Sequence, residues 1–154
     1  ALLTNDALDK ADRGRGHEVF KQRCAACHQM HGEGGKIGPD LTGANRTDLE
    51  YLLSNILTPS AIVQDDYKMR MVHTKDGRFF SGVVVSEDDR QLRLRIANEE
   101  PVAIARSQIA DLEVSELSMM PEGLLNGLTD QQVVELFAYL RSLEPVTAPG
   151  TADR

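Results

Sequence analysis

A pair of cysteines three positions apart, with a histidine directly after the second, constrains this 154-residue chain more than any other feature. They lie in the segment CAACHQMHGEGGKIGPDLTG, at Cys24 and Cys27, and are the only cysteines in the sequence. Val19 and Phe20 precede Cys24 at helical spacing, which predicts that a helix runs into the motif. Any interpretation must therefore explain two thiols and the imidazole of His28 held close together near a helical turn.

Three common uses of such a cysteine pair are considered first. A disulfide is compatible with a protein outside the cytoplasm. A thioredoxin-like redox couple places its motif at the start of a helix, where the helix dipole lowers the thiol pKa, and not at the end of one. A zinc site could use the two cysteines with His28 and His31, but such a site usually takes its second ligand pair from a distant segment. The sequence holds no second CxxC, CxxH or HxxH pair.

Covalent attachment of a haem explains more of the segment. Two thiols three residues apart on a helical turn can bond the two vinyl-derived carbons along one haem edge, and His28 can then bind the iron. The other ring nitrogen of such a ligand is commonly held by a backbone carbonyl. The Gly-Pro turn can supply one, since Pro39 has a fixed φ and no N–H, and Leu41 would then lie against the ring. A plain surface turn is the alternative for GPDLTG taken alone.

These segments resemble the class I cytochromes c. GRGHEVFKQRCAACHQMHGEGGKIGPDLTG is similar to their N-terminal helix, haem-attachment motif and histidine-orienting loop, and MMPEGLLNGLTDQQVVELFAYLRSL is similar to their methionine-proline loop and C-terminal helix. More narrowly, the chain resembles the haem-binding domain at the C-terminus of large planctomycete and verrucomicrobial proteins, where it often follows a dehydrogenase-like propeller. The resemblance covers residues 12–143 and implies one covalently bound haem c.

The resemblance also implies a methionine as the sixth iron ligand. The family pattern places this ligand directly before a proline, which selects Met120, and Met119 is the alternative. The other methionines are assigned to the core or lie too close to His28 to reach the opposite haem face: Met69 and Met71 in the first case, Met30 in the second. Three further histidines are expected at the surface, and ligation by one of them stays an alternative: His17, His31 and His73.

Three helices are expected around the haem, near residues 12–24, 47–57 and 129–143. The second of them is expected to line the haem through Leu53 and Ile56. Thr129 and Gln132 predict a capping box at the start of the last helix. An apolar stripe follows this cap, made of Val133, Leu136, Phe137, Leu140 and Leu143.

The resemblance adds a prediction about how the first and last helices meet. In cytochromes c these helices cross, and a glycine beside an aromatic residue allows their close approach. In this chain Gly16 and Phe20 are expected to meet Tyr139. Ordinary core packing of the same residues would give almost the same picture.

Residues 67–115 have an alternating pattern instead of a helical one. MRMVHTKDGRFFSGVVVS predicts two strands around the Asp76-Gly77 turn, and QLRLRIA, PVAIA and IADLEV predict three more. Five short strands predict a small SH3-like or Sm-like barrel, or a twisted sheet. The predicted fold class is α+β overall: a mainly α cytochrome c fold made of residues 1–66 and 116–154, with a β-rich insert at 67–115.

The charges divide between these two parts. Residues 67–115 hold eight basic and eight acidic residues, so the formal net charge of −7 belongs to the remainder. This acidity argues against nucleic-acid binding, which needs a basic surface. The candidate partners for haem propionates are arginines, although a solvated face is the alternative for each: Arg46, Arg70, Arg93 and Arg95.

These features predict an electron carrier and not an enzyme. A histidine–methionine pair fills the iron coordination and favours electron transfer. The resemblance implies transfer of single electrons from an extracytoplasmic dehydrogenase to a respiratory acceptor, a cytochrome or an oxidase. The uncharged residues Ala25, Ala26 and Gln29 suit weak docking of such partners. The alternatives are a haem-based gas or redox sensor with a displaceable methionine, and a peroxidase-type haem enzyme.

Location and context are predicted from the same features. Covalent haem and the family context predict a periplasmic protein, whose export signal is absent from a chain that begins at Ala1. No apolar run is long enough for a membrane span. Residues 1–11 and the Pro/Ala/Thr-rich tail after Leu143 are expected to be linkers, as in a domain tethered to a larger polypeptide.

Overall fold

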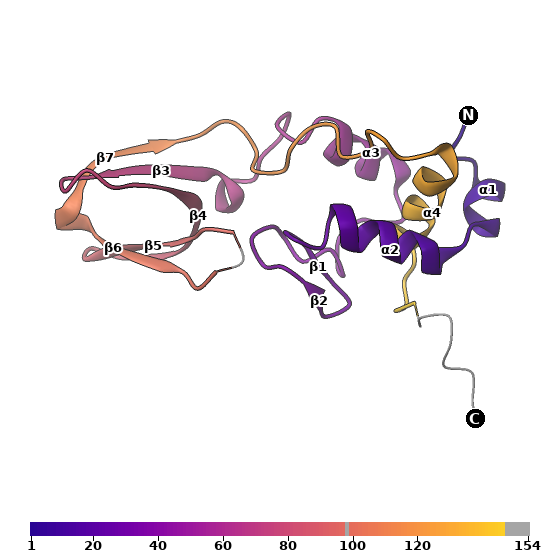
Figure 1. The fold of residues 1–154 in the computed structure, drawn as a ribbon, viewed down its shortest axis with the longest axis horizontal. Coiled ribbons are helices and arrows are strands. Elements are labelled where there is room, and N and C mark those ends of the chain that lie inside the picture. The colour runs from indigo at the N-terminus through magenta and orange to yellow at the C-terminus, as the bar shows by residue number, and fades with distance from the viewer. Residues whose placement is uncertain (98, 147–154) are drawn as a thin grey trace, which may run out of the picture.

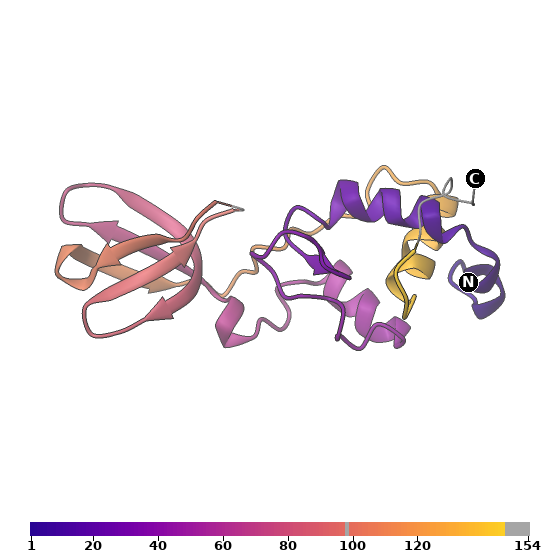
Figure 2. The ribbon, with the colours of Figure 1, turned by 90° about the horizontal axis from the view of Figure 1, so that it is seen from below.

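The structure is a computed structural model that describes residues 1–97 and 99–146. Its helices lie at one end of an elongated molecule and a five-stranded sheet lies at the other (Figure 1), and the view from below in Figure 2 shows the same separation. Hydrophobic side chains form two separate clusters, one among the helices and one in the sheet. The chain is thus α+β, as the sequence predicts. No helix of the described residues is long and apolar enough to cross a membrane.

The helices begin where side chains cap their first turns. Asp12 accepts hydrogen bonds from two backbone N–H groups of the second helix, and Asp48 does the same for the third. Thr129 and Gln132 form the predicted capping box of the fourth. The bounds are α1 (Asn5–Lys10), α2 (Arg13–Arg23), α3 (Leu49–Leu57) and α4 (Asp130–Leu140), with short 3-10 turns η1 (Asp65–Tyr67) and η2 (Arg106–Gln108).

A glycine lets α2 and α4 touch at their crossing. A Cβ atom on Gly16 would lie 2.0 Å from the carbonyl oxygen of Glu135, so only glycine fits. The rings of Phe20 and Tyr139 lie with their centroids 5.3 Å apart, and both residues are buried. The contact predicted between Gly16, Phe20 and Tyr139 is therefore confirmed.

Two predictions about the ends of the helical part are wrong. Residues 1–11 are not a linker, because Thr4 caps α1 and Leu8 is buried in the helical cluster. Leu143 does not extend the apolar stripe of α4, because this helix ends at Leu140, and Leu143 is 73% exposed. Most of the tail predicted as a linker, residues 147–154, lies outside the described residues.

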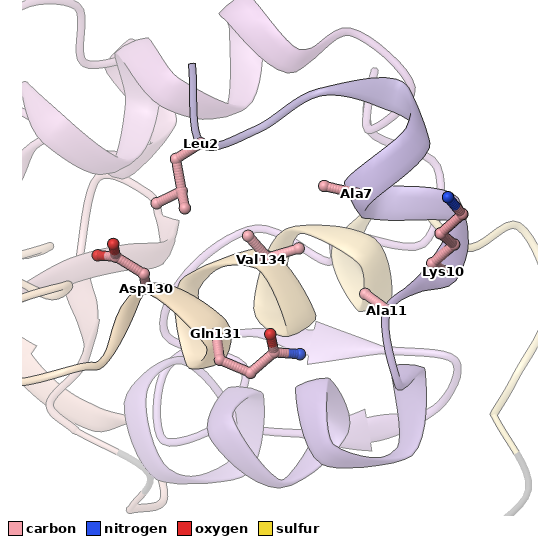
Figure 3. Close-up of a pocket in the computed structure, with 7 residues that line it drawn as sticks. All are labelled: Leu2, Ala7, Lys10, Ala11, Asp130, Gln131 and Val134. Carbon is pink, nitrogen blue, oxygen red and sulfur yellow. The ribbon is translucent and has the colours of Figure 1, made fainter.

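A cavity of about 360 Å³ lies between α1 and the start of α4 (Figure 3). Its one basic side chain, Lys10, is paired with Asp6 at 2.7 Å. None of the residues predicted to form the functional site lines this cavity. The lining residues are Leu2, Ala7, Lys10, Ala11, Asp130, Gln131 and Val134.

The five predicted strands are present and pair antiparallel in the order β6-β5-β4-β3-β7. Gly77 has a φ of 87° in the turn between β3 and β4, which confirms the predicted hairpin. β6 and β7 lie at the two edges, and no ladder of the described residues joins them, so the strand order matches the twisted-sheet alternative. The bounds are β3 (Met69–Thr74), β4 (Phe79–Glu87), β5 (Gln91–Arg95), β6 (Val102–Ala105) and β7 (Ile109–Val114).

The sheet has a small core of its own. Leu92 and Leu94 are fully buried with Val72, as the alternating pattern of QLRLRIA predicts. Met69 and Met71 were predicted to be core residues, and this prediction is wrong, because both are only half-buried. The Ser81 hydroxyl donates a hydrogen bond to the Met69 sulfur at 2.9 Å.

Candidate functional site

The CxxCH motif forms a further turn at the end of α2. Cys24 caps this helix, and its N–H still donates to the carbonyl oxygen of Phe20. The carbonyl oxygen of Cys24 then accepts from the N–H groups of Cys27 at 3.1 Å and His28 at 2.9 Å. The backbone thus holds the two thiols and the imidazole together, and the helix ends one residue before the position that the sequence predicted.

The two thiols are free and half-buried. Burial, together with repulsion from Cys27, raises the pKa of Cys24 to about 12. Redox-active CxxC pairs need the opposite, a lowered thiol pKa. Within the described residues, no group of three or more His, Cys, Asp and Glu side chains could hold a metal ion. The arrangement fits neither a thioredoxin-like couple nor a zinc site.

The imidazole of His28 is fixed by the Gly-Pro turn. Its Nδ1 lies 2.8 Å from the carbonyl oxygen of Pro39, the hydrogen bond that the sequence predicted. A carbonyl oxygen only accepts, so Nδ1 carries the proton and Nε2 keeps its lone pair. A lone pair at Nε2 is what metal ligation by histidine requires.

A glycine that the sequence analysis overlooked allows this approach. A Cβ atom on Gly38 would lie 2.7 Å from His28 Cε1 and 2.9 Å from Nδ1. The N–H of Gly38 donates to the carbonyl oxygen of Cys27 at 2.8 Å, which fixes the loop against the motif. The signal was present in the sequence, since Gly38 directly precedes Pro39.

The chain after the motif forms a small hairpin that was also not predicted. Its strands, β1 (Gln29–Met30) and β2 (Glu33–Gly34), are antiparallel. Gly34 has a φ of 115°, and a Cβ there would lie 2.1 Å from the carbonyl oxygen of His28. We call residues 29–36 the attachment hairpin. α2 precedes His28 in the chain and the attachment hairpin follows it, and Gly34 of the hairpin packs against the backbone of His28.

The helical cluster brings together predicted site residues that are far apart in the sequence. Ile56 is buried in the cluster, and four other predicted site residues are partly buried and pack against it. The remaining predicted residues, Cys27, His28 and Pro39, are joined to this group by the backbone and imidazole hydrogen bonds described above. The predicted residues in the cluster are Cys24, Leu41, Leu53, Ile56 and Met120.

The structure distinguishes the two adjacent methionines before Pro121. Met120 packs against the helical cluster, whereas Met119 is not among the described residues that do so. The N–H of Met120 donates to the Ser118 hydroxyl at 3.1 Å, and the N–H of Ser118 donates to the Ser60 hydroxyl at 3.0 Å. These two serines, which the sequence analysis did not single out, fix the methionine loop to the segment after α3.

Arg46 has a role that the sequence did not suggest. It is 3% exposed, so the expectation of a solvated face is wrong. Its Nη1 donates to the carbonyl oxygens of Leu140 at 2.6 Å and Ser142, and Nη2 donates to that of Thr42 at 2.9 Å. It therefore closes the end of α4 onto the loop after Pro39. Its Nε is buried without a hydrogen-bond partner among the described residues.

The three further histidines have different surroundings. His17 stacks on Tyr139 with ring centroids 4.9 Å apart, and its Nε2 lies 3.1 Å from a Glu33 carboxylate oxygen. The Nε2 of His31 is buried without a hydrogen-bond partner among the described residues. The expectation of surface positions is therefore right only for His73, which is exposed.

Comparison with known proteins identifies the family. The family model for cytochrome c matches residues 14–93, just over half of the chain.

The chain belongs to the cytochrome c family.

Curated relatives include cytochrome c of Cochliobolus lunatus, 50% identical over 37 residues, which are 23% of this chain and 34% of that protein. Cytochrome c of Stellaria longipes is 51% identical over 35 residues, 22% of this chain and 32% of that protein. The chain thus spans about a third of the length of the curated relatives it matches. The family match includes the CxxCH motif and α3 but ends at Arg93, before Met120.

Cytochrome c family proteins bind covalently attached haem c, and the predicted cofactor is thereby confirmed. The described residues fit this group in three ways. Two free thiols lie at the C-cap of α2 and in the turn that follows it, His28 is held through Nδ1 so that Nε2 can bind a metal, and the apolar helical cluster includes Cys24 and Met120. The unpartnered Nε of Arg46 is a buried donor that could serve a propionate. Family membership supports a haem-based electron carrier.

Proposed function

We propose that this protein is a mono-haem electron carrier in which Cys24 and Cys27 hold the haem and His28 and Met120 bind its iron. The hydrogen bond from His28 Nδ1 to Pro39 supports this proposal most strongly, because it selects the neutral tautomer in which Nε2 has the lone pair that binds iron, and two free thiols lie in the same turn. The contact of Met120 with the helical cluster supports the second ligand. Met119 remains the alternative, and it lacks that contact.

The haem supplies an iron that changes its oxidation state by one electron. The residues of the chain set how readily it does so. His28 is held in one tautomer and one orientation by Pro39. The thioether of Met120 is neutral and soft, favours ferrous iron and raises the reduction potential. Leu41, Leu53 and Ile56 belong to the helical cluster and would give the haem apolar contacts.

We further propose the domain organisation that the sequence predicted, with residues 1–66 and 116–154 as the cytochrome part and 67–115 as a β-rich insert. Two observations support it. The sheet has its own hydrophobic cluster. The chain enters and leaves the sheet at neighbouring points, since the N–H of Ser115, directly after β7, donates to the carbonyl oxygen of Met69, the first residue of β3, at 2.8 Å. In this organisation the chain is the planctomycete type of haem-binding domain, attached to a larger polypeptide.

The partners and location are proposals of the same kind. The carrier would accept single electrons from a dehydrogenase outside the cytoplasm and pass them to a respiratory cytochrome or oxidase, in the periplasm. Two features support this. One is covalent haem attachment. The other is that Ala25, Ala26 and Gln29 beside the attachment cysteines are uncharged, which suits the small, weak docking surfaces typical of electron transfer.

Attachment of the haem tests the proposal directly. The chain is produced together with export and haem-maturation machinery, denatured in acid-acetone, and separated from free haem. Wild type should retain its haem, whereas the Cys24→Ala/Cys27→Ala variant should release it or fail to mature. A wild-type chain that loses all haem would refute the attachment. Strong carbon monoxide binding by the reduced wild type would favour a gas sensor or a peroxidase-type enzyme over a carrier.

A further inference from the structure

A cleft of about 730 Å³ lies between the attachment hairpin and the sheet. Figures 1 and 2 both show the hairpin turned toward the connection between β5 and β6. One wall comes from the residues that follow His28, and the other from β4, β5 and that connection. The lining residues are Gly34, Gly35, Lys36, Val85, Arg93, Arg95, Glu99, Glu100 and Pro101.

Three cations of this lining have no acidic partner within the described part of the chain. Arg93 and Arg95 lie on the face of β5 opposite the buried Leu92 and Leu94, so both guanidinium groups belong to one side of the strand. Both residues are half-buried, and Lys36 is exposed. Among the described residues, none of the three side chains forms an ion pair or a hydrogen bond. Half-buried guanidinium groups without acceptors suit an oxyanion, which they can bind in a two-pronged manner.

The cleft also has an apolar part. The register of β4 against β5 shifts between Val84 and Ser86, so Val85 is the extra residue of a β-bulge. Bulges re-aim a side chain and are frequent beside functional sites, and Val85 lines the cleft with Pro101. Inorganic anions have no use for apolar contacts, so this lining favours a ligand with a carbon skeleton.

We propose that this cleft binds a small organic anion that carries carboxylate or phosphate groups. Its oxyanion groups would accept hydrogen bonds from Arg93, Arg95 and Lys36, and its carbon skeleton would contact Val85 and Pro101. Glu99 and Glu100 belong to the same lining and weaken the attraction of the cleft for an anion. The lining still holds three cationic side chains and two carboxylates. Because Lys36 comes from the attachment hairpin and the arginines from the sheet, the ligand would join the two parts of the molecule.

The haem-loaded, ¹⁵N-labelled full chain tests this proposal in titrations with glutarate and, separately, with inorganic phosphate. Sodium chloride keeps the ionic strength constant and serves as the control anion. Saturable shifts are expected for the backbone amides of residues 34–36 and 93–95. An unchanged Soret band shows that the anion does not bind the iron. Saturation by glutarate alone assigns carboxylates, and saturation by phosphate alone assigns phosphate groups; either supports the site.

Variants separate a specific site from general attraction. Arg93→Gln and Arg95→Gln should each weaken binding about tenfold, the usual effect of losing a charged hydrogen bond. Arg90→Gln removes the same charge from an exposed turn outside the cleft and should change the affinity less than about twofold. The Glu99→Gln/Glu100→Gln variant should bind more tightly. Arg95→Lys keeps the positive charge and should bind more tightly than Arg95→Gln. That result would show that the loss in Arg95→Gln comes from the missing charge and not from misfolding.

Three results would overturn the proposal. These are shifts that rise linearly without saturation, shifts that chloride reproduces, and equal weakening by Arg90→Gln and Arg95→Gln. A further readout is thermal stability, because a ligand that binds only the folded chain raises its melting temperature. At the same concentration, glutarate or phosphate should raise the melting temperature of wild type more than that of Arg95→Gln.

Discussion

Gly38 lies directly against the imidazole of His28. A Cβ atom on this glycine would come within 2.7 Å of Cε1 and 2.9 Å of Nδ1, closer than non-bonded carbon atoms allow. The same short segment supplies the carbonyl oxygen of Pro39 to Nδ1. The loop can therefore orient the histidine only because its first residue has no side chain.

Gly38→Ala should consequently destabilise the protein by roughly 1–3 kcal/mol, the usual cost of overpacking. Gly43→Ala is the matched control, because nothing lies within 4 Å of a Cβ there and its φ is not left-handed. Urea unfolding of both variants, followed by circular dichroism, measures the difference. Equal stabilities would mean that the loop moves away from His28 without cost.

Met120→Ala should abolish the charge-transfer band of ferric methionine-bound iron and lower the reduction potential by on the order of 100 mV, since a thioether favours ferrous iron. Met119→Ala is the matched control and should retain the band, because Met119 does not share the contact of Met120 with the helical cluster. Absorption spectra and redox titration measure both effects. Loss of the band in Met119→Ala, with its retention in Met120→Ala, would mean that Met119 and not Met120 is the iron ligand.

Arg46→Met should destabilise the chain by about 3–5 kcal/mol. The change removes a charged donor from the carbonyl oxygens of Leu140, Ser142 and Thr42, and leaves buried acceptors unpaired. Arg46→Lys should recover only part of the loss, because an ammonium group lacks the planar fork of a guanidinium. Chemical unfolding gives the free energies. A loss below about 1 kcal/mol in Arg46→Met would show that water or a loop shift replaces these bonds.

Asp40 should make the loop after Pro39 sensitive to acid. Hydrogen bonds from the Thr42 hydroxyl at 2.7 Å and the Thr42 N–H at 2.9 Å hold the pKa of Asp40 below its usual value of 3.8. A lowered folded-state pKa contributes stability above the unfolded-state pKa, and that stability is lost as the pH falls through the folded-state pKa. Wild type should therefore be more stable than Asp40→Ala at pH 6, and the gap should narrow below pH 4.

Urea unfolding of wild type and Asp40→Ala across pH 2.5–6 would measure this gap. Asp6→Ala is a suitable control, because Asp6 forms only an exposed pair with Lys10 on α1. A gap that stays constant with pH would mean that the charge of Asp40 does not contribute.

Replacement of residues 67–115 by a short Gly/Ser linker should leave a folded, haem-loaded protein. The hydrogen bond between Ser115 and Met69 shows that the two ends of the sheet lie close enough for such a linker. As far as the structure describes the chain, the hydrophobic cluster of the helices contains no residue of the five-stranded sheet. The reduction potential should change only modestly, and electron exchange with the dehydrogenase should slow. Lost methionine ligation and increased carbon monoxide binding would instead show that the sheet forms part of the haem pocket.

The local features of the site could be predicted from the sequence because they depend on residues close together in the chain. The spacing of Cys24, Cys27 and His28, and the geometry of a Gly-Pro turn, fix which groups can meet within one short segment. The hydrogen bond to Pro39, the capping box at Thr129 and the Asp76-Gly77 hairpin are of this kind. Each is set by backbone geometry over a few residues.

Features that depend on distant segments could not be predicted in the same way. Arg46 looks like any surface arginine in the sequence, and only the fold brings it to the end of α4. α1 has too short an apolar pattern to be recognised alone, because its burial of Leu8 requires α4 as a partner. The prediction for Leu143 failed for the opposite reason. The apolar spacing of α4 continues to Leu143 in the sequence, but the helix ends at Leu140.

The sequence by itself determined the chemistry of the attachment site and the α+β class, because thiol spacing and hydrophobic periodicity are local properties of the chain. Tertiary structure alone decided which methionine packs against the helical cluster, and that Lys36, Arg93 and Arg95 line the same cleft. Both depend on where the chain goes between segments, and that path is set by the burial of apolar side chains over the whole molecule.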